Sequence, residues 1–376
     1  MIGESFFNGR KRELAPEQAA DAPNTPAVFM LWADRGAPYL ARTALLRRRL
    51  TRLLRDSGSP SRLLNLIGVS RRIEYWECGS RLESSLLFYT LARTHYPADY
   101  LKVTKLRMPA YVKLTLANPF PRTLVTTRFG AGRGQLFGPF RSRASAEQFD
   151  AQALDLFQIR RCQENLEPRA DHPGCMYGEM GRCLRPCQTV VNQAEYASEV
   201  ARFGQFLSTQ GASLLENVQA SRDRFSENLE FENAERQHKL HERIQQVLSL
   251  RDDLATVAEH LCGVAITPSA SPETVTLWFM VSGAWIDPIE FPVGQTGGRA
   301  VSLDQRLRQQ VSAISPTAPA ITDRQEHLAL LAKWFYSSWR DGEWLAFDRL
   351  EAVPYRKLVN AVARVAKKMD FANSGV

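Results

Sequence analysis

Four cysteines gathered in one short segment constrain this chain more than any other feature. They are Cys162, Cys175, Cys183 and Cys187, and they fall within 26 residues rich in Gly, Pro and Arg. Thiolates are soft ligands, so a segment that closes four of them on one centre favours an iron–sulfur cluster or zinc. Zinc sites usually contain two close cysteine pairs. Here 12, 7 and 3 residues separate successive cysteines, a spacing that favours a cluster and leaves zinc open.

Two other interpretations of the cysteines are a pair of disulfides and four unrelated buried thiols. The N-terminal stretch MIGESFFNGRKRELAPEQ lacks the apolar core of a signal peptide, which indicates a cytoplasmic protein, and disulfides are rare in that compartment. The clustering argues against unrelated thiols. No run of eighteen apolar residues is present, so we expect no membrane partner.

The charge balance points to an acidic partner. The 376 residues carry 48 Lys and Arg against 40 Asp and Glu, for a net charge of +8. The guanidinium fork binds two phosphate oxygens at once, so clustered arginines suit nucleic acid, although any single cluster can be a solvated face. The clusters are Arg47, Arg48, Arg49, Arg52 and Arg55; Arg71 and Arg72; Arg141 and Arg143; Arg160 and Arg161; and Arg182 and Arg185.

Hydrophobic periodicity predicts an α+β protein of several domains. The expected parts are a flexible polar tail over 1–25, a small β-β-α-β-α domain over 26–100, a β linker segment over 101–145, a four-cysteine region over 146–207, a helical hairpin over 208–252 that breaks near 227–229, and a small α+β region over 260–376.

Four stretches resemble the N-terminal two thirds of UvrC, the bacterial excinuclease family of nucleotide excision repair. They are YVKLTLANPFPRTLVTTR, FGPFRSRASAEQFDAQALDLFQIRRC, PGCMYGEMGRCLRPC and SRDRFSENLEFENAERQHKLHERIQQV, the last similar to the family's UVR motif. The similarity runs from about Ala27 to about Pro292.

This resemblance implies ligands and partners. The four cysteines would hold a 4Fe–4S cluster, with zinc as the alternative. DNA would be bound by arginines, and the hairpin would bind a UvrB-like damage-loading subunit, although a charged helix pair can also be a plain solvated hairpin. The residues concerned are Arg47, Arg48, Arg49, Arg161, Arg182 and Arg185 for DNA, and Leu229, Phe231, Glu232 and Arg236 for the partner.

The first domain of the family is a GIY-YIG nuclease, which the resemblance places over 26–100. Such a domain cuts a phosphodiester with one Mg²⁺ or Mn²⁺ ion held by a glutamate, while tyrosines position water and an arginine steadies the phosphate. The first motif here ends in Phe29, which lacks the hydroxyl, and the second reads Tyr39-Leu40-Ala41. Tyr39 and Arg49 match the family's catalytic pattern.

The metal-binding glutamate is replaced. With His95 and Pro97 fixing the register of the helix, the family's glutamate position is Phe88, and Glu83 lies five residues earlier, out of helical phase. A phenyl ring cannot ligate a hard cation that requires oxygen. We therefore expect the nuclease activity to be lost or much reduced.

Three functions stay open at this point. The first is a DNA-repair-associated protein that binds DNA and the loading subunit without cutting. The second is an active endonuclease in which Glu83, Glu77 or Glu74 supplies the metal ligand. The third is a regulator that competes for the loading subunit without touching DNA. In the last hundred residues, Asp304, Asp323, Asp341 and Asp348 read as surface carboxylates rather than a second nuclease site.

Overall fold

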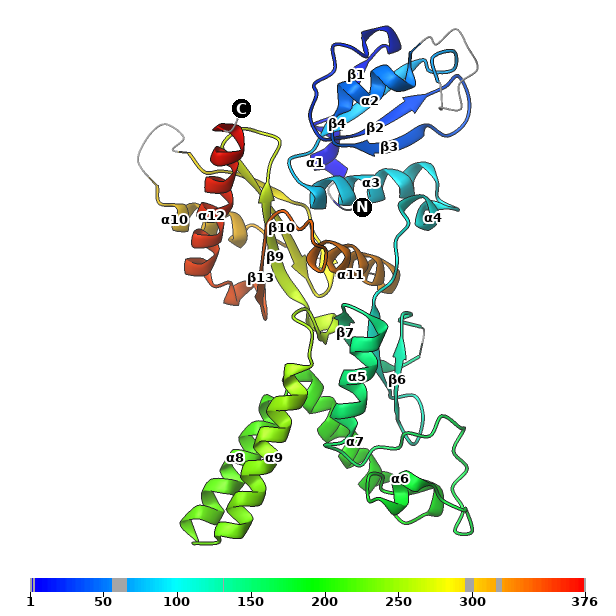
Figure 1. Ribbon diagram of the computed structural model, residues 1–376, viewed down its shortest axis with the longest axis vertical. Coiled ribbons are helices and arrows are strands. Elements are labelled where there is room, and N and C mark those ends of the chain that lie inside the picture. The colour runs from blue at the N-terminus through cyan, green and yellow to red at the C-terminus, as the bar shows by residue number, and fades with distance from the viewer. Residues whose placement is uncertain are drawn as a thin grey trace. The chain divides into compact units, whose positions relative to one another are not determined.

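The computed structural model describes residues 2, 4–55, 66–130, 132–294, 301–315 and 320–374. The chain forms two compact units, one made of Met1–Arg107 with Cys262–Val376 and the other of Met108–Leu261. Each unit combines helices with antiparallel sheets (Figure 1), so the α+β class is confirmed. None of the described helices is long and apolar enough to span a bilayer.

The N-terminal part of the first unit is built on a four-stranded antiparallel sheet. Its strand order is β1-β4-β2-β3. Alternate residues of a strand point to opposite faces, so Phe29 and Ala41 pack beside the apolar side of α2, while Arg42 faces α3. The elements are β1 (Arg12–Leu14), β2 (Ala27–Trp32), β3 (Tyr39–Thr43), α2 (Leu46–Leu53), β4 (Arg72–Glu77) and α3 (Arg81–His95). After residue 26 they follow one another in the order β-β-α-β-α.

The expectation of a flexible tail over 1–25 is wrong. Residues Glu4–Asn8 form α1, and β1 pairs with β4 in the register Arg12↔Tyr75. Phe7 is buried, and its carbonyl oxygen accepts a hydrogen bond of 2.8 Å from the indole nitrogen of Trp76. The few apolar side chains of this polar segment are enough to anchor it, and β1 gains ladder hydrogen bonds as an edge strand.

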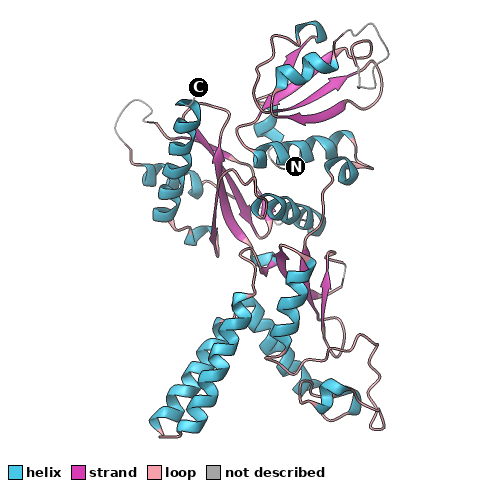
Figure 2. Ribbon diagram, in the orientation of Figure 1, coloured by secondary structure: helices cyan, strands magenta, loops and turns pink. Residues whose placement is uncertain are grey.

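The C-terminal part of the first unit is a second antiparallel sheet with helices against it (Figure 2). Helices α10 and α12 pack on its apolar face. The elements are β9 (Cys262–Pro268), β10 (Thr274–Val281), β11 (Ala284–Trp285), β12 (Ile289–Pro292), α10 (Leu303–Ser312), α11 (Ile321–Phe335), β13 (Glu343–Phe347) and α12 (Tyr355–Ser374).

Helix α11 packs against α3 through buried polar contacts. The hydroxyls of Tyr89 and Tyr100 donate to the carboxylate of Glu326, which is buried, and the Tyr100 bond is 2.6 Å long. Arg93 and Asp323 form an ion pair of 2.7 Å beside them. The helix that carries Phe88 is therefore held inside the first unit.

The reading of the C-terminal aspartates as surface carboxylates is wrong for two of them. Asp323 is committed to the ion pair with Arg93. Asp341 accepts hydrogen bonds from the indole nitrogen of Trp334 at 3.1 Å and from the backbone N–H of Arg81 at 2.5 Å. Both carboxylates therefore join the two parts of the first unit.

The second unit contains a four-stranded sheet of order β6-β5-β7-β8 with helices packed against it. The expected linker over 101–145 is not a separate segment, because Val112 and Leu114 share one core with Phe149 of α5 and Phe203 of α7. The elements are β5 (Ala110–Thr115), β6 (Thr123–Thr126), β7 (Gly134–Phe140), α5 (Arg143–Leu154), α6 (Met176–Glu179), α7 (Gln193–Ser208), α8 (Ala212–Glu227), α9 (Phe231–Ser249) and β8 (Thr256–Val257).

Helices α8 and α9 form a long hairpin, visible as two side-by-side helices in Figure 1. The break covers 228–230, within one residue or so of the expected position, and Leu229 adopts a left-handed backbone with φ of 59°. The predicted helical hairpin is therefore present.

Candidate functional site

Tyr39 and Arg49 remain a hydrogen-bonded pair on the α2 side of the first sheet. Arg49 Nη2 donates to the Tyr39 hydroxyl at 3.2 Å, and both side chains are half-buried. Phe29 lies fully buried with its ring centroid 6.2 Å from that of Tyr39. The aromatic ring of Phe29 therefore still packs in the core at the position of the first motif's tyrosine, but the tyrosine hydroxyl is absent.

Phe88, the position at which the resemblance expects a metal ligand, lies beside the positive charge of Arg42. The guanidinium of Arg42 lies 4.9 Å from the centroid of the Phe88 ring and donates to Ser85 Oγ at 3.0 Å. Desolvation of the guanidinium beside Phe88 lowers the pKa of Arg42, a residue that remains exposed elsewhere, although an arginine stays protonated at neutral pH. The nearby charge of Arg42 also lowers the pKa of Lys333 on α11, after the larger effect of burial. Two like charges here disfavour a divalent cation.

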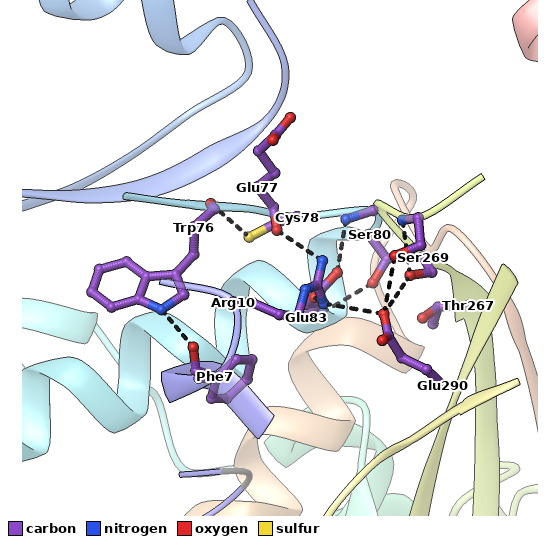
Figure 3. A network of polar contacts seen from close by, with 12 residues as sticks. Phe7, Arg10, Trp76, Glu77, Cys78, Ser80, Glu83, Thr267, Ser269 and Glu290 are labelled. Carbon is purple, nitrogen blue, oxygen red and sulfur yellow. Dashed lines mark hydrogen bonds and ion pairs between the residues drawn. The ribbon is translucent and has the colours of Figure 1, made fainter. Parts of the chain in front are cut away.

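Glu83, the first possible substitute ligand, is committed to another contact. It is fully buried, forms an ion pair with Arg10, and accepts the backbone N–H of Gly79 at 2.7 Å (Figure 3). Burial raises the pKa of Glu83 to about 7, against the lowering effect of Arg10. Both carboxylate oxygens of Glu83 are therefore already engaged, one by Arg10 and the other by Gly79.

Glu77 and Glu74, the other possible substitutes, are also engaged. Glu77 Oε2 accepts from Thr25 Oγ1 at 2.7 Å. Glu74 is buried and pairs with Arg72 at 2.9 Å and with Lys11 at 3.4 Å. Over the part of the chain that the structure describes, no three His, Cys, Asp or Glu side chains are arranged to hold a metal ion.

Positive charge is concentrated at the N-terminal end of the chain. Residues 1–107 contain eighteen Lys and Arg against ten Asp and Glu, which accounts for the whole net charge of +8. Side chains of α2 line a groove of about 340 Å³, here named the α2 arginine groove. It consists of Asn24, Arg47, Arg48, Thr51, Arg52 and Arg55. Arg47 is fixed there by donating to the carbonyl of Ala22 at 2.7 Å, while Arg48 and Arg52 are exposed.

The second unit brings the four clustered cysteines into one region. Cys183 and Cys187 are buried, Cys162 is half-buried, Cys175 is exposed, and none is in a disulfide. Burial, with a smaller contribution from the charges of the other three thiols, raises the pKa of Cys183 to about 11, so each of those thiols lies within electrostatic range of Cys183. The four sulfurs lie in one region, but among the described residues they are not arranged as the ligands of a bound metal ion.

Arginine groups surround these cysteines. Arg160 is 1% exposed and donates to Cys162 Sγ at 3.4 Å, and its Nη2 is buried without a partner. The backbone N–H of Arg185 donates to Cys183 Sγ, also at 3.4 Å. A set of four thiols beside a buried cation fits an anionic, thiolate-bound centre, as structural zinc and iron–sulfur sites require.

The structure does not support every arginine predicted to bind DNA. Arg161 is 13% exposed and forms an ion pair of 2.7 Å with Asp155, which leaves little of its guanidinium accessible to DNA. Arg182 pairs with the same carboxylate at 3.0 Å but is half-exposed. Arg185 is exposed. Asp155 also lies 3.7 Å from Arg243 of α9, so one carboxylate links the cysteine region to the hairpin.

The hairpin tip presents apolar side chains to solvent. Leu229 is 71% and Phe231 is 66% exposed. Glu232 and Arg236 follow on the first turns of α9 and are also exposed, with Arg236 donating to Asn233 Oδ1 at 3.4 Å. Exposed large apolar residues rimmed by charges are typical of a protein-binding surface.

Sequence reasoning missed the residues that act through distant contacts. Arg42, Asp155 and Glu326 belong to no motif, and each acquires its role from a partner on another element. Arg160 was grouped with phosphate-binding arginines, whereas its burial excludes that role.

The fold and these sites define an α+β protein of two units with a four-cysteine region and an exposed helical hairpin. Residues 110–206 match the model of the UvrC/Cho excinuclease middle domain. The UvrABC system protein C of Moorella thermoacetica is 25% identical over 324 residues, 85% of this chain and 52% of that protein. Those of Lachnospira eligens and Rickettsia typhi are 22% identical over 329 residues and 27% identical over 224 residues.

The chain is therefore similar to UvrC proteins, both in its middle domain and over most of its length. It spans about half of the Moorella and Lachnospira proteins and 36% of the Rickettsia typhi protein. No solved structure matches it.

Proposed function

We propose that this chain is a cytoplasmic, UvrC-like protein of nucleotide excision repair that binds DNA and a UvrB-like damage-loading subunit, with its nuclease activity lost or much reduced. Residues 26–100 are then a degenerate GIY-YIG domain, 146–207 a four-cysteine iron–sulfur region and 208–252 a UVR hairpin. The observation that carries the loss of activity is that Phe88, at the family's metal-ligand position in the sequence, packs against Arg42 on the α3 side of the sheet, away from Tyr39 and Arg49.

Three further contacts support the loss of nuclease activity. The metal-binding carboxylate is absent, and Glu83, Glu77 and Glu74 are each held by other partners. Removing one charge stabiliser of this kind commonly lowers the rate by about 100- to 1000-fold. The residues present therefore do not fit Mg²⁺ or Mn²⁺. Tyr39 and Arg49 are then vestiges of the site.

DNA binding is supported by the α2 arginine groove and by the charge of residues 1–107. Phosphate contacts release condensed counterions, so each one makes the affinity fall more steeply with salt. Arg47, Arg48 and Arg49 lie on α2, and Arg182 and Arg185 near the cysteines add a second basic surface.

Reversing two groove charges is expected to weaken DNA binding and flatten its salt dependence. In the Arg48→Glu/Arg52→Glu variant, the slope of log K against log salt should fall by about 2, because each duplex phosphate contact contributes about 0.9. Fluorescence anisotropy with a labelled duplex at several salt concentrations measures this. The control is Arg356→Glu, which makes the same charge change per residue at an exposed position of α12.

Equal losses in the variant and the control would show that the groove is not the binding surface. If the unmodified protein has no salt-sensitive DNA affinity at all, the regulator that competes for the loading subunit without DNA becomes the better account.

The four-cysteine region is proposed to hold a 4Fe–4S cluster, with zinc as the alternative. Cys162, Cys175, Cys183 and Cys187 would be the ligands, supported by the electrostatic effect of the other three thiols on Cys183 and by the free state of every thiol. When bound, the group would cross-link a segment that otherwise has little regular structure. That bracing would fix Arg182 and Arg185 for phosphate contact.

The hairpin tip is proposed to bind the loading subunit. Leu229 and Phe231 would enter an apolar site on the partner, while Glu232 and Arg236 match its charges.

A further inference from the structure

Arg160 is a fully buried arginine with unusual partners. Its Nε donates to the carbonyl of Phe120 at 2.8 Å, and its Nη1 donates to the carbonyl of Glu164 at 3.0 Å. The same Nη1 lies 3.3 Å from the carbonyl oxygen of Cys162 and 3.4 Å from its sulfur. Its backbone N–H donates to the Tyr196 hydroxyl at 3.0 Å, so the residue is fixed from both ends.

No carboxylate compensates the charge of Arg160 within the described residues. Its acceptors are three neutral carbonyl oxygens and one sulfur, and Nη2 is buried without any acceptor. A buried charge is normally paired, because leaving one uncompensated in a low-dielectric interior is strongly unfavourable. The neighbouring arginines differ in this respect, since Arg161 and Arg182 share Asp155 and Arg185 is exposed.

We propose that Arg160 is the buried counter-cation of the four-cysteine centre. The inference rests on the proposed function, in which four thiolates hold a cluster or a zinc ion. Four thiolates outweigh the positive charge of divalent zinc or of an oxidised cluster core, so the loaded centre is anionic. Arg160 supplies the opposite charge from inside the fold, and its Nη1 orients the Cys162 sulfur by the contact already present. Such outer contacts tune metal affinity and redox potential.

The competing explanation is a purely structural clamp. Arg160 ties Phe120 to Glu164 through their carbonyl oxygens, and this role depends on the shape of the guanidinium rather than on its charge. Two substitutions separate the explanations. Arg160→Lys keeps the charge and loses the fork, whereas Arg160→Gln loses the charge and keeps a planar donor.

The test uses the full chain loaded with iron and sulfide or with zinc. Metal per chain and resistance to a competing chelator are measured for the unmodified protein, both variants and the control Arg169→Gln, which removes an exposed charge. Arg160→Gln should lower the affinity for the metal at least about tenfold, the usual effect of outer-shell loss, and Arg160→Lys and the control should retain it. With a cluster bound, the reduction potential of Arg160→Gln should move to more negative values, because a lost cation destabilises the more negative reduced state.

Equal losses in the Lys and Gln variants would overturn the proposal in favour of the clamp. Unchanged affinity and potential in Arg160→Gln would overturn it outright. If Arg160→Gln does not fold, the Arg160→Lys variant is the deciding test. A metal-loaded Arg160→Lys protein supports the proposed role of the positive charge, and a metal-free one contradicts that role. An unmodified chain that binds neither iron nor zinc would instead refute the proposed centre itself.

Discussion

Replacing Leu229 and Phe231 together by aspartate is expected to abolish binding of the hairpin to a UvrB-like subunit. Both side chains are more than 60% exposed at the tip, with Leu229 at 71% and Phe231 at 66%. Two buried anchor residues contribute about 2 kcal/mol or more each in protein interfaces, so the dissociation constant should rise by about a thousandfold. Calorimetry or anisotropy with the purified partner measures the change.

The hairpin itself should survive this substitution, because neither residue belongs to the buried positions of α8 and α9. Gln245→Asp, an exposed position on α9 away from the tip, is the matched control and should bind normally. Helical content and thermal unfolding of all three proteins establish that they are folded. Undiminished binding by the double variant would remove the hairpin tip from the partner interface.

Replacing Cys183 by alanine is expected to remove nearly all bound metal. The thiol is buried among the other three clustered cysteines, and the methyl group of alanine cannot replace it as a soft ligand. Because metal binding and local folding are coupled, the segment over 160–190 should also become sensitive to limited proteolysis. Iron and zinc analysis of the purified protein gives the primary result.

Cys262→Ala provides the comparison for this experiment. Cys262 is equally buried, at 7% exposure against 6% for Cys183, but lies in β9 of the other unit. It should keep its full metal content while losing some stability from the smaller side chain. An iron- or zinc-loaded Cys183→Ala protein would exclude Cys183 as a ligand.

Local patterns in the sequence predicted the features that depend on local structure. The β-β-α-β-α order follows from short apolar runs, and the hairpin follows from apolar residues at helical spacing that stop at 228–230. The exposed tip follows from the same periodicity, because Leu229 and Phe231 fall at the break.

Long-range pairings were not predictable in this way. β1 is a three-residue polar edge strand whose pairing with β4 spans about sixty residues, so composition made it resemble a tail. The burial of Arg160 and the ion pair between Arg161 and Asp155 depend on how the cysteine segment folds back onto α5. The sequence of an arginine cluster does not indicate whether its members are exposed or buried. Arg42 meets Phe88 only after β3 and α3 pack together.

Nicking of supercoiled plasmid is the most direct test of the proposal that this UvrC-like chain holds DNA without cutting it. The metal-loaded protein is incubated with UV-damaged or undamaged plasmid in Mg²⁺ or Mn²⁺, with and without the damage-loading proteins, and its DNA affinity is measured in the same buffers. We expect salt-sensitive binding and no nicks above background, since Phe88 stands where the resemblance expects the metal-binding glutamate and packs against Arg42. Metal-dependent nicks that disappear in Arg49→Ala would contradict the account and show that the altered site still works.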